Sequence, residues 1–388
     1  GMIQVKEETK IILAGRHPQD HEGAVNTPVY HASTILYPSL AALRGREPMR
    51  YTYGRRGTPT SKALEEAMCD LEGADGCVIT PSGASAVAVA ILSVAKAGDH
   101  ILMVDSAYYP TRSFCDKMLA GLGIETEYYD PLLGADIASL FRDNTSLVFM
   151  ESHGSQTFEV QDLPAICAAA KSAKIKTAID NTWASPHFFK PLVHGVDLSI
   201  QAATKYIVGH ADALLGTVCA NKTSHSDLRH IHGLLGLCAG PDDVFLALRG
   251  LRTLSTRLRQ HQESAIAIAK WLQTFDFVRQ VFHPALPEAQ GHDIWKRDFT
   301  GAAGLFAFEV NPYSEQQLAN MLDHMSLFGM GYSWGGFESL IVPAEITRTA
   351  TAFDNSRQLL RLNIGLEHID DLKNDLYQGF IRAGYLKA

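Results

Sequence analysis

Short apolar runs alternate with longer segments of helical periodicity along most of this chain. The expected strands are 76–80, 100–104, 147–150, 176–180, 196–200, 213–220, 304–310 and 360–365. The expected helices are 7–14, 61–73, 84–95, one from 111, 163–173 and a long one over 242–275. Strand–helix alternation predicts an α/β protein with a mostly parallel sheet, and the last 110 or so residues indicate a smaller α+β unit.

Three parts follow from this pattern. We expect an N-terminal arm over 1–58, a large domain over 59–247 and a C-terminal small domain over 248–388. The arm lacks periodicity and is too long for a simple loop. Such an arm indicates contact with a neighbouring subunit, so we expect a homo-oligomer.

Composition narrows the classes of partner. The 388 residues are 46% hydrophobic and 20% charged, as in ordinary globular proteins. The net charge of -8 argues against nucleic acid, and neither a bilayer-spanning run nor a secretory pattern is present. Six scattered cysteines without a C-x-x-C pair favour a reducing cytoplasm.

The first candidate for chemistry is Lys205, which follows the apolar run 196–200 and several small residues. Dehydration by such neighbours would lower the pKa of the amine and make it a nucleophile toward a carbonyl group. A surface lysine at a strand end is the alternative.

A small-residue turn, Ser82–Ala84, joins an expected strand to an expected helix. Its backbone N–H groups at the helix start would suit a phosphate. The turn is neither a Walker loop nor G-x-G-x-x-G, and a hydrolase elbow around Ser85 would need glycine in place of Val87.

Tyr108 and Asp180 follow strands at their carboxyl ends, where open α/β sheets bind ligands. A packing tyrosine and a capping aspartate are the alternatives. Arg361 alternates with apolar residues and needs either a structural or a substrate carboxylate. The histidines near 225–232 lack carboxylate partners at fixed spacing, so we expect no metal site.

Together these groups match the chemical needs of pyridoxal 5'-phosphate. Its phosphate needs the N-terminus of a helix, and its aldehyde needs a lysine. Its ring needs an aromatic side chain to stack on and an acid that pairs with the ring nitrogen. An amino-acid substrate needs an arginine for its carboxylate.

The chain resembles the Cys/Met-metabolism pyridoxal-phosphate enzymes, of aspartate-aminotransferase fold type I, over essentially its whole length. The motifs that carry the resemblance are Tyr53–Thr58, Asp180–Ala184, Gln201–Tyr206, Tyr332–Leu340 and Arg361–Glu367. Within that family the chain is similar to the bacterial cystathionine β-lyase branch. This resemblance implies cleavage of an amino-acid thioether, cystathionine, to homocysteine, pyruvate and ammonia in methionine biosynthesis.

The resemblance also implies roles for individual residues. Lys205 would hold the cofactor and act with Tyr108 in catalysis, Tyr108 would stack on the ring and Asp180 would pair with the ring nitrogen. The phosphate would be held by Ser82, Gly83, Ala84 and Thr204, and by Tyr53 and Arg55 of a neighbouring subunit. Substrate would contact Ser333, Trp334 and Arg361. The family usually forms tetramers as dimers of dimers.

The chain departs from the family pattern at several positions. Ala202 stands where S-x-T-K has serine, and Pro110 stands where the methionine γ-lyases have cysteine. The motif E-S-P-x-N-P becomes Glu151–Gln156, which puts His153 in place of proline and Ser155 in place of asparagine. A broader cysteine or thioether lyase and a γ-eliminating enzyme remain alternatives, as do a serine hydrolase and a scaffold.

Overall fold

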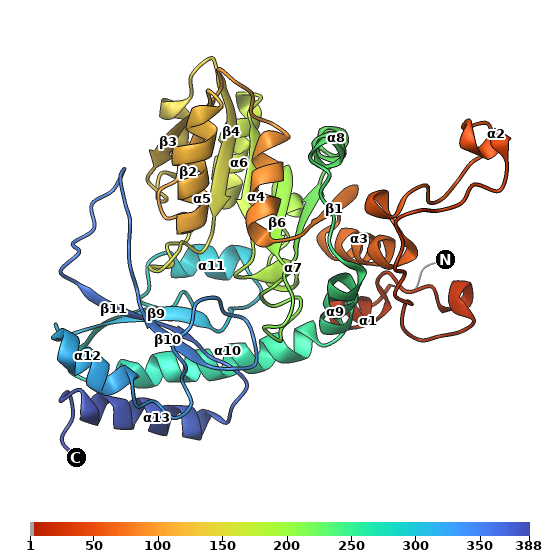
Figure 1. The fold of residues 1–388 in the computed structure, drawn as a ribbon. Helices are drawn as coiled ribbons and strands as arrows, with labels where there is room; N and C mark the ends of the chain where they lie inside the picture. Colours follow the sequence, from red (N-terminus) through yellow and green to blue (C-terminus); the bar gives the residue numbers. More distant parts are fainter. Residues whose placement is uncertain (1–3) are drawn as a thin grey trace.

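Two β-sheets organise the molecule (Figure 1). A computed structural model describes residues 4–388. The large sheet has the strand order β1-β7-β6-β5-β4-β2-β3, and the small one has the order β10-β11-β9-β8. In the large sheet only the pairs that include β7 are antiparallel, which confirms the prediction of a mostly parallel sheet.

The strands of the large sheet are short, and most of their positions are buried except in one edge strand. They are β1 Gly76–Thr80, β2 His100–Val104, β3 Glu125–Tyr129, β4 Thr145–Glu151, β5 Lys176–Asp180, β6 Leu198–Ala202 and β7 Gly216–Ala220. β2 is buried at every position, as expected for a parallel strand covered on both faces. Most positions in such strands are apolar, which is why the sequence pattern locates them.

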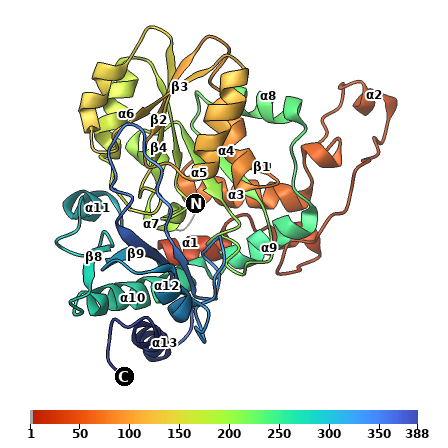
Figure 2. The same ribbon diagram turned by 60° about the vertical axis from the view of Figure 1, so that its left-hand side comes forward.

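Helices accompany these strands. They are α1 Glu7–Leu13, α2 Leu40–Leu43, α3 Pro59–Glu72, α4 Gly83–Leu92, α5 Tyr109–Ser113, α6 Leu163–Ser172, α7 Ser185–Phe188, α8 His225–Leu235 and α9 Pro241–Leu251. Helices α3, α4 and α6 pack against the strands. The arm around α2 projects from this body in both Figure 1 and Figure 2.

The C-terminal unit has an antiparallel sheet covered by helices, which confirms the α+β prediction. Its elements are α10 Leu254–Leu272, β8 Val278–Phe282, α11 His292–Asp298, β9 Leu305–Val310, α12 Glu315–Leu322, β10 Leu340–Pro343, β11 Gln358–Asn363 and α13 Ile369–Arg382. Phe306, Phe308 and Leu360 of the sheet share a core with Leu272 and Phe380 of the helices. The division at residues 58 and 247 stays a prediction.

One expected element is wrong: the helix over 242–275 is two helices, α9 and α10. Thr253 leaves helical geometry between them, with φ -110° and ψ 13°. Arg257 stabilises the break, since its guanidinium donates to Thr253 Oγ1 at 3.0 Å and to the Gly250 carbonyl at 2.6 Å. Within residues 4–388, no helix combines the length and the hydropathy needed to cross a membrane.

A buried carboxyl gives the fold a pH-dependent stability. Burial raises the pKa of Glu72 to about 7, although hydrogen bonds from Cys219 and Ser199 and the charge of Lys190 oppose the shift. Because the folded state holds this proton more tightly than the unfolded chain, stability falls as the pH rises from about 4.5 to 7. We expect Glu72→Gln to raise the free energy of unfolding at pH 8 by up to about 3 kcal/mol.

Urea unfolding of Glu72→Gln at pH 5 and pH 8 checks this expectation. The gain over the parent should be much larger at pH 8 than at pH 5. Glu263→Gln, at an exposed position of α10, is the control and should change stability by less than about 0.5 kcal/mol at either pH. An equal effect of Glu72→Gln at both values would contradict the titration argument.

Candidate active site

Lys205 lies just beyond the carboxyl end of β6, in a turn closed by its amide to the Ala202 carbonyl at 3.0 Å. Its amine hydrogen-bonds to the Ser333 hydroxyl and lies 5.3 Å from the Trp334 ring centre. Burial and then Arg361 lower its pKa to about 8, against the opposing effect of Asp180. A substantial fraction of the amine is therefore neutral near physiological pH.

Asp180 ends β5, the strand beside β6, and its Oδ1 accepts from the Thr182 hydroxyl at 2.6 Å and the Thr182 amide at 3.1 Å. Burial raises its pKa, while these hydrogen bonds and Lys205 act in the opposite direction. Glu151 ends the next strand in register with Asp180. Burial and then Asp180 raise the pKa of Glu151 well above its ordinary value, so burial favours the neutral form of this second acid.

A single cavity brings the predicted catalytic groups together. It is lined by Tyr108, Asp180, Lys205, Trp334 and Arg361. Tyr108 follows β2, and its amide donates to Glu151 Oε1 at 3.2 Å. Arg361 comes from β11 and donates to the Ser333 carbonyl at 3.1 Å. The site thus joins the carboxyl ends of the large sheet to the small domain.

The helix start at Ser82–Ala84 packs against Ala202, which lines this cavity. Ser82 caps α4 by accepting from the Ser85 amide at 3.0 Å, while the Gly83 and Ala84 amides have no partner within residues 4–388. A Cβ at Gly83 would come within 2.5 Å of the Ala202 side chain, so only glycine allows this approach. The Thr204 hydroxyl, by contrast, is engaged with the Leu215 backbone.

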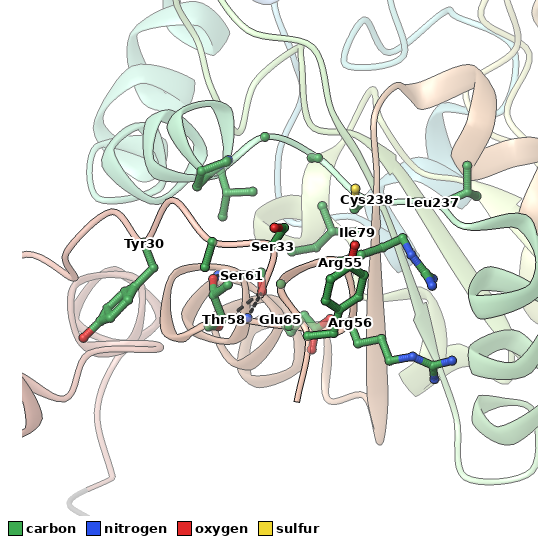
Figure 3. A pocket seen from close by; sticks show the side chains of 18 of the residues that line it. Tyr30, Ser33, Arg55, Arg56, Thr58, Ser61, Glu65, Ile79, Leu237 and Cys238 are labelled. Atoms are coloured by element: carbon green, nitrogen blue, oxygen red, sulfur yellow. Dashed lines mark hydrogen bonds between the residues drawn. The ribbon is translucent and has the colours of Figure 1, made fainter. Parts of the chain in front are cut away.

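Two predicted residues, Tyr53 and Arg55, lie away from Lys205. They line a separate pocket with Arg56, Glu65 and other residues of the arm, α3 and α8–α9 (Figure 3). Tyr53 is 41% exposed. Within one chain the structure therefore does not bring these two residues to the cavity.

The donor set fits pyridoxal phosphate. The unpartnered amides of Gly83 and Ala84 suit a phosphate, Asp180 suits a ring nitrogen, and the Lys205 amine suits the aldehyde. Sequence reasoning missed two contributors, Thr182 and Glu151. The signal for Glu151 was available, because it follows the apolar strand 147–150 as Asp180 follows its own strand.

Comparison with known proteins identifies the family of this chain. The family model described as "Cys/Met metabolism PLP-dependent enzyme" matches residues 8–381. A putative cystathionine beta-lyase of Rhizobium johnstonii is 50% identical over 380 residues, covering 97% of this chain and 96% of that protein. Cystathionine beta-lyase MetC of Escherichia coli is 48% identical over 393 residues, covering 98% of this chain and all of that protein.

The solved structures agree on the fold. The crystal structure of cystathionine gamma synthase from Xanthomonas oryzae, in complex with aminoacrylate and cysteine, is 33% identical with a TM-score of 0.91. The match covers 98% of this chain and 99% of that one. It confirms the fold type expected from the sequence. The chain belongs to the Cys/Met metabolism PLP-dependent enzyme family.

Proposed function

We propose that this protein is a carbon–sulfur β-lyase that cleaves cystathionine with water to homocysteine, pyruvate and ammonia. The observation that carries the proposal is the single cavity that joins Lys205, Asp180, Tyr108 and Arg361. The two relatives named cystathionine beta-lyase support the choice of substrate.

Cofactor binding is assigned to residues around this cavity. Gly83 and Ala84 amides at the start of α4, with Ser82, would hold the phosphate, and Asp180 would hold the ring nitrogen protonated. Lys205 would attach the aldehyde. When bound, pyridoxal phosphate supplies an electron sink for the charge left at the substrate Cα.

The chain's own groups then move the protons. The Lys205 amine, neutral in part because its pKa is lowered to about 8, takes the Cα proton as a general base. The same Nζ then carries a proton that it can give to the departing sulfur at Cβ. Ser333 accepts the amine's hydrogen bond and so directs Nζ toward the cavity.

Arg361 positions the substrate for this transfer. Its guanidinium is buried, and within residues 4–388 no carboxylate pairs with it. A substrate α-carboxylate would supply the missing anion. Tyr108 would stack on the cofactor ring, and Trp334 would shape the entry.

The test is a product assay on the purified enzyme with its cofactor. Pyruvate from cystathionine, with less from cysteine and no 2-oxobutyrate from methionine, is the expected result. Faster cleavage of cysteine would favour the broader thioether lyase, and 2-oxobutyrate would favour γ-elimination. A preparation without the visible absorption of the cofactor would favour the hydrolase or scaffold alternatives.

We also propose that the enzyme is a homo-oligomer in the cytoplasm. The projecting arm exposes apolar side chains, among them Leu36 at 83%, Leu40 and Leu43. Tyr53 and Arg55 lie outside their own chain's cavity, which supports a role at the cofactor phosphate of a neighbouring subunit. Sedimentation of the intact chain tests the assembly, and a monomer would contradict it.

A further inference from the structure

One wall of the cavity has a strained backbone. The wall is the loop 153–159, which contributes His153, Gly154, Ser155, Gln156 and Phe158. Gln156 and Phe158 have φ values of 72° and 56°, in the left-handed region that side chains other than glycine rarely adopt. Residues in such conformations cluster at ligand sites.

Gln156 is the residue that makes this loop distinctive. It stands where the motif E-S-P-x-N-P has its second proline, whose ring fixes φ near about -65°. A proline therefore could not adopt the conformation seen here. The Gln156 side chain lines the cavity, and its buried Oε1 has no hydrogen-bond partner within residues 4–388. Oε1 is an acceptor, and the Nε2 end of the same amide carries two N–H donors that can bind an anion.

A segment of the small domain holds the loop in this conformation. Residues 344–357, here called the strap, join β10 to β11 and extend toward the large domain in Figure 1. Arg348 of the strap donates to the Ser155 carbonyl at 3.0 Å and to the Thr157 hydroxyl at 2.8 Å, and it lies 3.5 Å from Glu159. Its side chain is only 5% exposed.

The strap is itself anchored beside Tyr108. The Asp105 carboxylate accepts from the amides of Thr349, Ala350 and Thr351 at 2.8–3.1 Å, and it pairs with Arg112 at 3.1 Å. Burial acts to raise the pKa of Asp105, but these hydrogen bonds outweigh it and the pKa is lowered. Asp105 therefore stays ionised, and the strap stays in place.

The cavity already has a partner for one end of a substrate. Arg361, on β11, is assigned to the α-carboxylate next to Lys205. Gln156 reaches the cavity from the loop after β4, a different element of the other sheet. Much of the remaining lining is apolar, including Phe158, Trp183 and Leu305. A substrate with a second amino-acid group would need a polar partner at its far end.

We propose that Gln156 is a specificity-determining residue whose amide donates to the far carboxylate of a thioether with two amino-acid groups, and that Arg348 positions it. This inference rests on the proposed β-lyase function. It makes the strap and the loop 153–159 the parts of the site that favour cystathionine over short thiols such as cysteine.

The test compares kcat/KM for cystathionine and for cysteine in the enzyme with its cofactor. Gln156→Gly keeps the backbone conformation, because glycine adopts positive φ freely, and removes the amide. We expect a loss of about tenfold with cystathionine, mainly in KM, and less than about twofold with cysteine. Gln156→Glu should lose more with cystathionine, because it places a carboxylate opposite a carboxylate.

Arg348→Ala should lower the ratio of kcat/KM for cystathionine to kcat/KM for cysteine, and Arg348→Lys should restore part of this ratio. The control is Lys174→Gly, which replaces another left-handed residue (φ 58°) after α6, on the surface, and should leave both substrates unchanged. If Gln156→Gly leaves the ratio of kcat/KM for cystathionine to kcat/KM for cysteine unchanged, because both values stay the same or fall equally, this inference is wrong. The β-lyase proposal would not be affected by that result. A parent enzyme that cleaves neither substrate would overturn the β-lyase proposal and this inference with it.

Discussion

Lys205→Ala should abolish nearly all lyase turnover, because in the proposed function one amine both attaches the cofactor and moves the Cα proton. Loss of a general base alone lowers rates by about 10²- to 10⁴-fold, and loss of the attachment adds to this. Pyruvate release from cystathionine measures the turnover. Borohydride reduction followed by mass spectrometry should add the cofactor mass to the parent and not to the variant.

Lys176→Ala is the matched control. Lys176 begins β5, at the opposite end of the strand from Asp180, and its amine donates to Thr223 and Ser224. We expect this variant to keep turnover within about twofold, since its lysine lies at the other edge of the sheet. Normal turnover in Lys205→Ala would refute the assignment of the base.

The parts of the site at strand ends were predictable from the sequence. Asp180 and Lys205 each follow an apolar run, and the carboxyl ends of neighbouring parallel strands meet at one edge. The structure places both side chains on one cavity. Local pattern was enough for Asp180, because the apolar run before it ends β5 at the predicted residue. The end of β6 was located less well, since this strand ends at Ala202, two residues later than predicted.

Elements with mixed exposure were missed. β3, Glu125–Tyr129, is an edge strand, and four of its five residues keep some exposure. The break between α9 and α10 was also missed, because buried Leu248, Leu251, Leu254 and Leu258 continue one apolar stripe through it. The helix ends there because of Thr253 and its contact with Arg257, and an apolar pattern does not encode such a contact.

The contacts of the strap could not be predicted from the sequence for a different reason. Asp105 and Thr351 are 246 positions apart in the sequence, and their hydrogen bond depends on how the small domain packs on the large one. No short motif marks either residue. The same holds for Arg348, whose partners lie more than 190 positions earlier. These contacts follow from the tertiary arrangement, and therefore only the structure gave them.

Asp180→Asn should lower kcat by about 100-fold or more and weaken cofactor binding. The reason is that a neutral amide at the end of β5 no longer favours a protonated ring nitrogen, and breaking a buried charge pair costs about 3–5 kcal/mol. Burial raises the pKa of Asp180, and the hydrogen bonds from Thr182 and the charge of Lys205 oppose this rise. A cationic ring nitrogen would oppose it further. Turnover and a cofactor titration followed by absorbance measure the two effects.

Glu151→Gln is the comparison that separates charge from position. Glu151 lies in register with Asp180 on the next strand, but burial and the Asp180 charge raise its pKa well above the ordinary value. An amide has nearly the same shape as a carboxylic acid, and its oxygen can still accept from the Tyr108 amide. We expect a loss in kcat of less than about threefold. Equal losses in the two variants would mean that Asp180 acts through packing rather than through its charge, and the ring-nitrogen role would then be wrong.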